Sequence, residues 1–238
     1  MNLDKSAPKV IIACDFQSKI ELNNFLAKFP PSEKLFLKLG MELVYGVGFE
    51  IIQELKNRGH AIFLDLKLHD IPVTMLKALH SLNQYKVDFL TIHLAAGQKS
   101  LDLLAQEAPN LAMKLLGVSV LTSLDDQDVQ TLFQNPALSS NGLALNLAGL
   151  AARSNLYGLI CSPREAKVIK STYPKLKLIT PGIQMGTNQQ SDQKRVATPR
   201  QAAEWGSDFL VVGRLITQSL DPYQTYKTII KEFINENN

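Results

Sequence analysis

Ala61-Ile62-Phe63-Leu64-Asp65-Leu66-Lys67-Leu68-His69-Asp70-Ile71-Pro72 begins as an apolar run and ends in charged residues. The run is typical of a buried strand, so the charges are expected at its carboxyl end. Because successive side chains of a strand alternate between its two faces, Asp65 and Lys67 should share one face, with the leucines on the other. We place Asp70 just past the strand end, close enough to join them.

Two carboxylates and an ammonium at the end of a buried strand cost free energy unless they satisfy one another. A reactive site is one reason to keep them there. An ion pair at a solvated strand end is the other, because perturbed ionic networks can be purely structural. This stretch alone leaves both interpretations open.

Similar apolar runs recur along the chain and alternate with segments of helical periodicity. The runs cover residues 10–15, 35–40, 61–67, 87–93, 114–121, 157–162, 176–181 and 209–213. The amphipathic segments cover residues 20–29, 49–58, 73–85, 100–107, 142–154, 164–171, 199–205 and 223–234. Eight such units favour a closed barrel over a doubly wound sheet, because a barrel has no edge strands to protect. We predict an α/β fold, a (β/α)8 TIM barrel, in one domain over residues 1–238.

The composition narrows the classes of function. The 238 residues are 45% hydrophobic and carry a formal net charge of +3, without a basic tail or patch that would indicate a nucleic-acid partner. Cys14 and Cys161 lie far apart and form no zinc or disulfide pattern, which predicts reduced thiols. The first residues lack the apolar core of a signal peptide, and no run is long enough for a membrane span. We therefore predict a cytoplasmic protein without a membrane partner.

Polar residues stand at the carboxyl ends of several predicted strands, which converge on one face of a barrel, where barrel enzymes have their active sites. Three consecutive strands contribute alternating charges, which is hard to attribute to chance. For the opening stretch, a reactive site is therefore favoured over an ion pair with a purely structural role. The strand-end residues are Asp15, Lys38, Asp65, Lys67, His93, Thr122, Ser123, Ser162, Pro181, Gly182, Gly213 and Arg214.

The two last strands are followed by features of a different kind. Residues 182–198 form a long, polar, glutamine-rich loop that we interpret as a lid. Gly213 and Arg214 end the eighth run and lead into a segment that could begin a short helix. Loops after strands seven and eight commonly bind phosphate in this fold, and Arg214 would add a charge-assisted contact. These features predict a phosphorylated small substrate.

Several motifs in this order resemble those of the orotidine 5′-phosphate decarboxylase family. They are Ala13-Cys14-Asp15, Leu37-Lys38-Leu39-Gly40, Asp65-x-Lys67-x-x-Asp70-Ile71-Pro72, Leu121-Thr122-Ser123, Thr180-Pro181-Gly182-Ile183, Asp192-Gln193 and Val212-Gly213-Arg214. The match extends from about Val10 to Pro222, nearly the whole chain. The Asp-x-Lys-x-x-Asp-Ile-Pro element is specific, whereas the others are weak singly and strong in this order.

The resemblance implies a homodimeric barrel that converts orotidine 5′-monophosphate to uridine 5′-monophosphate and CO2 without a metal or organic cofactor. It assigns the catalytic charges to Lys38, Asp65, Lys67 and Asp70, with Asp70 and Thr74 reaching the site of the partner subunit. The residues implied to bind substrate are Asp15, Lys38, Asp70 and Thr74 at the ribose, Thr122 and Ser123 at the pyrimidine, Pro181 near the base, and Gln193, Gly213 and Arg214 around the phosphate.

Departures from the family pattern concern the neighbours of these residues. Gln184 stands directly after Pro-Gly-Ile, where many bacterial members have Arg, so Lys194 or Arg195 could supply a missing cation. Val73 stands where Asn is common, between Pro72 and Thr74. Neither change affects the four charged residues Lys38, Asp65, Lys67 and Asp70.

Two other functions remain open at this point. Keto-gulonate phosphate decarboxylases and hexulose phosphate synthases share Asp-x-Lys-x-x-Asp but use magnesium, with an acidic residue where this chain has Lys38, a poor ligand for a hard cation. A barrel that only binds a phosphorylated ligand or a protein is the more distant alternative, and it would not need two lysines interleaved with two carboxylates. His93 is expected to pack beside the site rather than to act as a catalyst, and Gly46-Val47-Gly48 to form a turn.

Overall fold

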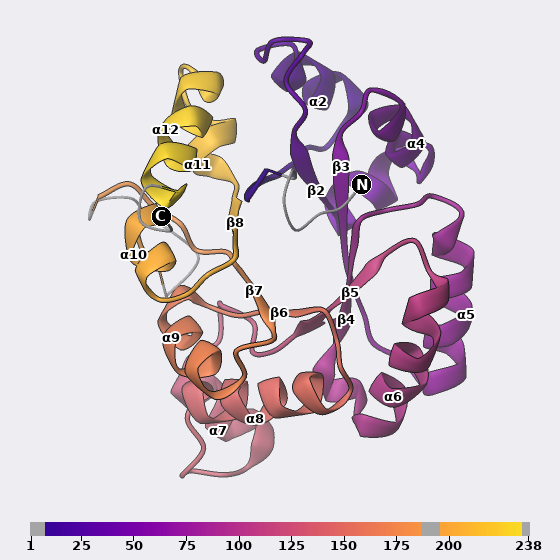
Figure 1. Ribbon diagram of the computed structural model, residues 1–238, viewed down its shortest axis with the longest axis vertical. Coiled ribbons are helices and arrows are strands. Elements are labelled where there is room, and N and C mark those ends of the chain that lie inside the picture. The colour runs from indigo at the N-terminus through magenta and orange to yellow at the C-terminus, as the bar shows by residue number, and fades with distance from the viewer. Residues whose placement is uncertain (1–7, 187–195, 235–238) are drawn as a thin grey trace.

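Eight parallel strands close into a barrel in the order of the chain in the computed structural model, which describes residues 8–186 and 196–234 (Figure 1). Each strand pairs with the next, and β8 pairs with β1, so no edge is left open. The (β/α)8 TIM barrel predicted from the sequence is confirmed. The strands are β1 (Val10–Ala13), β2 (Phe36–Gly40), β3 (Ala61–Leu68), β4 (Phe89–His93), β5 (Lys114–Val118), β6 (Gly158–Ile160), β7 (Lys177–Thr180) and β8 (Phe209–Val212).

Helices surround the strands on the outside (Figure 1). They are α2 (Lys19–Leu26), α3 (Met41–Val47), α4 (Glu50–Asn57), α5 (Pro72–Asn83), α6 (Gln98–Glu107), α7 (Asp126–Phe133), α8 (Ser140–Arg153), α9 (Pro163–Thr172), α10 (Pro199–Glu204), α11 (Arg214–Thr217) and α12 (Pro222–Ile234), with short 3-10 turns at Leu94–Ala96 and Ala108–Asn110. None of these helices is both long and apolar enough to cross a membrane.

The alternation of side chains along each strand divides the core into two parts. Leu64 and Leu66 of β3 belong to the large cluster between the strands and the helices, whereas Phe63 belongs to the cluster inside the barrel. Inside the barrel, the rings of Phe36 and Phe89 lie 5.0 Å apart, and those of Phe89 and Phe209 lie 5.4 Å apart. These aromatic rings fill the barrel, so it is a packed core with a floor rather than a pore.

Two helices were not expected from the sequence. The seven-residue α3 follows β2 directly, has no side-chain cap and ends at Gly48, whose φ of 88° stops the helix. The helix α7 begins with a capping box between Asp125 and Asp128 but buries only Val129, so its apolar periodicity is weak. Short helices with few buried residues give little signal in a search for amphipathic segments.

Two partly buried ion clusters lie at the starts of β4 and β8. The Oδ2 atom of Asp88, just before β4, accepts hydrogen bonds from Lys56 Nζ at 2.8 Å and from the backbone N–H of Ile62 at 2.7 Å. Asp208, just before β8, pairs with Lys170 at 2.7 Å and Lys177 at 3.1 Å. We call this end of the barrel the anchored face, because its charges join strands to neighbouring helices and strands.

His60, just before β3, makes the stability of the fold depend on pH. Its Nδ1 accepts the backbone N–H of Leu35 at 3.2 Å, and burial, together with Lys34 and Arg58, lowers the pKa of the imidazole to about 4. The neutral ring is favoured by folding, so its contribution is complete above pH 6.5 and is lost as the pH falls toward 4. We expect His60→Gln to flatten the decline of the urea midpoint between pH 7 and pH 4.5. His80→Gln, on the exposed face of α5, is the control and should keep the wild-type slope.

Candidate active site

A cavity of about 1030 Å³ opens at the carboxyl ends of the strands. This is the face where the sequence predicted the site. Its lining includes residues of β1, β2, β3, β5, β6 and β8 and of the segments that follow β1, β5, β7 and β8. Among the residues singled out at the strand ends and after Pro-Gly-Ile, those that line the cavity are Asp15, Lys38, Asp65, Lys67, Thr122, Pro181, Gly182, Gln184, Gly213 and Arg214.

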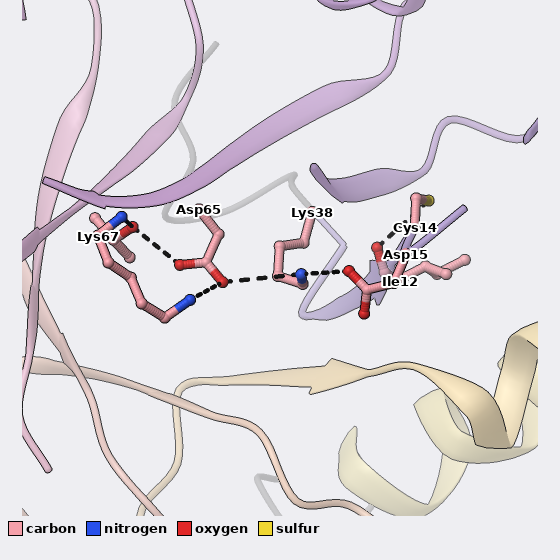
Figure 2. A network of polar contacts seen from close by, with 7 residues as sticks. Ile12, Cys14, Asp15, Lys38, Asp65 and Lys67 are labelled. Atoms are coloured by element: carbon pink, nitrogen blue, oxygen red, sulfur yellow. Dashed lines mark hydrogen bonds and ion pairs between the residues drawn. The ribbon is translucent and has the colours of Figure 1, made fainter. Parts of the chain in front are cut away.

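Four of these side chains form a continuous line of alternating charges (Figure 2). Lys38 Nζ lies 2.9 Å from Asp15 Oδ1 and 3.8 Å from Asp65 Oδ2. Lys67 Nζ lies 2.9 Å from the same Asp65 oxygen. The expectation that Asp65 and Lys67 share one face of β3 therefore holds, and Asp65 Oδ2 is shared by both lysines.

The middle of the line is its most buried part, and the side chain of Lys67 at the far end is 31% exposed. The Asp15 side chain is 53% exposed, but those of Lys38 and Asp65 are only 11% and 12% exposed. Burial alone would lower the pKa of Lys38, but the carboxylates of Asp65 and Asp15 outweigh burial and raise that pKa above its usual value. Lys38 therefore remains an ammonium inside the barrel mouth. Burial also raises the pKa of the neighbouring Cys14 thiol to about 12, which keeps it protonated.

Gly40, at the end of β2, leaves the room that this arrangement needs. A Cβ atom on Gly40 would lie 3.1 Å from Lys38 Nζ and 3.3 Å from Asp15 Oδ1. Any larger residue would press on the ion pair. Gly40 belongs to the motif Leu37-Lys38-Leu39-Gly40, but no role of its own was predicted for it.

The backbone of β3 leaves the regular ladder where it carries Lys67. The register with β4 runs through Leu64↔Leu90 and then shifts before Leu68↔Ile92. Lys67 has a φ of 51°, in the left-handed region that non-glycine residues rarely occupy. Its N–H donates to Thr91 Oγ1 at 2.8 Å, and that hydroxyl donates to Asp65 Oδ1 at 2.9 Å. Thr91 is a site neighbour that the sequence analysis missed.

Asp70 and Thr74 lie outside this cavity. Asp70 is exposed, and its Oδ1 accepts the N–H of Ile71 at 2.7 Å. In the part of the chain that the structure describes, no ion pair joins Asp70 to Lys38 or Lys67. Thr74, on the first turn of α5, is exposed and does not line the cavity. Within one chain, Asp70 therefore does not join Asp65 and Lys67, contrary to the expectation from its place just past the strand.

Most of the residues predicted to bind the base and the phosphate also line the cavity. Thr122, Pro181, Gly213 and Arg214 line it, but Ser123 is exposed and does not. Arg214 begins α11, the short helix that the sequence suggested. The list of predicted binding residues also contains Gln193, which lies outside the described residues, as do Lys194 and Arg195.

The base of the predicted lid is tied together. Gln184 N donates to Ala197 O at 2.9 Å, and Ala197 N donates to Gly182 O at 3.0 Å, so Ile183 and Ala197 form a parallel bridge. Gln184 is 9% exposed and lines the cavity at the position where the resemblance led us to expect Arg. An uncharged amide therefore occupies that part of the wall.

The histidine pair beside β3 and β4 stands next to the charged line. The rings of His69 and His93 stack at 5.0 Å, and burial, together with His69 and Lys67, lowers the pKa of His93. The His93 Nδ1 atom accepts the N–H of Ala95, which requires a neutral nitrogen. Its packing against His69 agrees with the expectation of a neighbour of the site. Within residues 8–186 and 196–234, no three His, Cys, Asp or Glu side chains are grouped as a metal site would need.

A family model described as the orotidine 5′-phosphate decarboxylase / HUMPS family matches residues 8–229 of this chain. The chain belongs to this family. The match takes in every described strand, from β1 to β8, and most of α12. The resemblance stated from the motifs is thereby confirmed.

Individual members of the orotidine 5′-phosphate decarboxylase / HUMPS family are similar to this chain over almost its full length. A protein of Streptococcus pneumoniae named orotidine 5′-phosphate decarboxylase is 43% identical over 227 residues, which is 95% of this chain and 97% of the relative. A protein of Streptococcus mutans with the same name is 41% identical over 227 residues, with 95% and 98% covered.

A crystal structure of orotidine 5′-phosphate decarboxylase from Lactobacillus acidophilus superimposes on this structure with a TM-score of 0.83. The two are 36% identical, and the match covers 95% of this chain and 99% of that one. The barrel fold of this chain is thus the fold of a relative that carries the family's name.

Proposed function

We propose that the protein decarboxylates orotidine 5′-monophosphate to uridine 5′-monophosphate and CO2, the last step of de novo UMP synthesis. The family membership and the names of the relatives support this carboxy-lyase activity. The observation that carries the proposal is the line Asp15, Lys38, Asp65 and Lys67 along one wall of the cavity. Such a line suits a reaction in which negative charge develops at one carbon.

The chemistry that we propose is electrostatic. Loss of CO2 from C6 of the pyrimidine leaves negative charge in an orbital that the ring delocalises poorly, so a cation beside C6 lowers the barrier. Lys67 supplies this cation and then donates the proton that replaces CO2. An ammonium has three N–H bonds, and Asp65 accepts from Lys67 Nζ at 2.9 Å, which leaves protons for the substrate. We assign no metal or organic cofactor to the reaction.

The rest of the substrate is assigned by the chemistry of the other walls. Asp15 and Lys38 would bind ribose hydroxyls, and Thr122, with Ser123, would contact the pyrimidine near Pro181. Arg214 would bind the phosphate in a charge-assisted contact, together with the backbone of Gly213 and with Gln193. Because the phosphate lies far from C6, its binding energy is available to assemble the closed site.

We propose a homodimer with shared active sites, in which Asp70 and Thr74 complete the site of the partner subunit. The position of Asp70 outside its own cavity supports this arrangement. Apolar side chains that follow it closely in sequence are exposed: Ile71 is 67% exposed and Val73 is 55% exposed. Apolar side chains beside a charged residue suit a contact between two subunits.

We further propose that the whole chain, residues 1–238, forms a single domain and that the protein is cytoplasmic. Every described strand, from β1 to β8, belongs to the one closed barrel, which supports a single domain. Among the described residues, Cys14 and Cys161 are both buried and unbonded to each other, which suits a reducing compartment.

The magnesium-dependent relatives and a barrel that only binds are less well supported. Lys38 stands between Asp15 and Asp65, and its raised pKa keeps it positive where those relatives have an acidic residue. A second ammonium, Lys67, lies on the other side of Asp65. Neither alternative explains why two cations are held along one cavity wall.

A spectrophotometric assay with a chelator tests the proposed function. The purified protein is mixed with orotidine 5′-monophosphate and EDTA, and the ultraviolet absorbance of the pyrimidine is followed. We expect the substrate to be consumed at the same rate with and without EDTA. Turnover of a sugar phosphate only when magnesium is added would assign the protein to the related enzymes instead. Binding of the nucleotide without any turnover would assign a binding function.

A further inference from the structure

Thr91 lies in the middle of β4 and is completely buried. It does not line the cavity, yet its hydroxyl contacts two of the residues assigned to catalysis. Oγ1 lies 2.9 Å from Asp65 Oδ1 and 2.8 Å from the backbone nitrogen of Lys67. The side chain therefore connects the carboxylate and the backbone that carries the ammonium.

The direction of these hydrogen bonds is fixed by chemistry. The N–H of Lys67 can only donate, so the threonine oxygen accepts from it. The single hydroxyl proton of Thr91 is then available for Asp65 Oδ1. With Oδ1 held by Thr91, Oδ2 is the atom that faces Lys67 at 2.9 Å and Lys38 at 3.8 Å. Thr91 thus fixes the rotation of the carboxylate that the two lysines share.

The same hydroxyl compensates for the irregular backbone of β3. At Lys67 the strand adopts a φ of 51° and its register with β4 shifts. A left-handed residue persists only where the surroundings hold it, and a buried N–H needs an acceptor. Thr91 Oγ1 is the acceptor that the neighbouring strand provides at that point. Without it, the peptide before Lys67 would lose the contact that favours this conformation.

We propose that Thr91 is a positioning residue for decarboxylation: its hydroxyl aligns the Asp65 carboxylate and the left-handed Lys67 backbone so that the ammonium is held at C6. The proposal rests on the proposed function and adds a residue that does not touch the substrate. Displacement of a catalytic group by about 1 Å can cost on the order of 100-fold in rate. Loss of the hydroxyl therefore acts on turnover more than on nucleotide binding.

Three variants of the full-length protein test the role of the hydroxyl. Thr91→Val keeps the shape and removes the hydroxyl, Thr91→Ser keeps the hydroxyl, and Thr180→Val removes a buried hydroxyl from β7 that bonds to Ser207 instead. Turnover is measured per nucleotide-binding site, with the sites counted by calorimetric titration with UMP. We expect kcat of Thr91→Val to fall roughly 10- to 100-fold. KM and the affinity for UMP should change little, Thr91→Ser should recover most of the activity, and Thr180→Val should keep the wild-type kcat.

The outcomes separate this proposal from the proposed function. If the wild type does not consume orotidine 5′-monophosphate, the proposed function fails, whatever Thr91 does. If the wild type is active and Thr91→Val has the same kcat per site, the positioning role is refuted. Should Thr91→Val not fold, Thr91→Cys replaces it, because a thiol is only a weak donor and a weak acceptor. Failure of both to fold, when Thr91→Ser folds, would show a purely structural role and overturn the proposal.

Discussion

Replacing Lys67 with Ala is expected to reduce turnover by roughly four orders of magnitude or more, because in the proposed mechanism Lys67 is both the electrostatic stabiliser and the proton donor, and each role is worth about two or more orders. The barrel should still fold. Asp65 would keep its hydrogen bond from Thr91 and its contact with Lys38, so its carboxylate would not be left buried and unpaired. Binding of UMP should remain measurable, since the contacts that we propose for the ribose and the phosphate are made by other residues.

Single-turnover kinetics with orotidine 5′-monophosphate and titration with UMP provide the two measurements. Lys114→Ala is the matched control, because Lys114 is an exposed lysine at the start of β5, at the other end of the barrel from the cavity. It should leave kcat unchanged. Near-wild-type turnover by Lys67→Ala would remove Lys67 from its assigned role and, with it, the proposed mechanism.

Two inactive variants should restore activity to each other when they form a mixed dimer. A chain with Asp70→Ala retains Lys67, and a chain with Lys67→Ala retains Asp70, so a hybrid of the two contains one site with both residues. Random pairing gives hybrids in half of the dimers and one intact site in each. The mixture is therefore expected to reach about a quarter of the wild-type activity per chain. Co-expression with two different affinity tags and sequential purification would isolate the hybrid for the assay.

The control for this experiment pairs Lys67→Ala with Asp65→Ala. Both residues belong to the same chain's cavity, at 2.9 Å from each other, so no hybrid site contains both. This mixture should remain as inactive as its components. Equal recovery in both mixtures, or recovery in neither, would contradict a site that takes Asp70 from the partner subunit.

The barrel could be predicted because buried parallel strands give continuous apolar runs, and eight of them alternate with helical segments along this chain. The charges at the ends of β1, β2 and β3 stood out against those runs. Alternation along β3 then sufficed to place Asp65 and Lys67 on one side, with Leu64 and Leu66 on the other, which the core clusters confirm.

Other features had no signal in the sequence. Thr91 is a β-branched residue within an apolar strand, where it is indistinguishable from a residue that only packs. Its contact depends on a register shift in β3, and Leu66-Lys67-Leu68 gives no sign that the strand is irregular there. The proximity of Asp70 was inferred from the short stretch that separates it from Lys67, but the turn after β3 carries it to the surface. Side-chain contacts between neighbouring strands, and the direction of the turns that follow them, cannot be predicted from such a pattern of residues.

The ion clusters of the anchored face lie at the opposite ends of the strands from the cavity. Asp88 and Asp208 join the beginnings of β4 and β8 to their neighbours, whereas the cavity residues lie at and beyond the strand ends. The residues that stabilise the barrel at the anchored face are thus far from the residues proposed to act in the reaction. Substitutions at the two ends should therefore change the free energy of unfolding nearly additively. A protein engineer could stabilise the anchored face to raise the melting temperature. The loops around the cavity could then be exchanged to admit a different nucleotide.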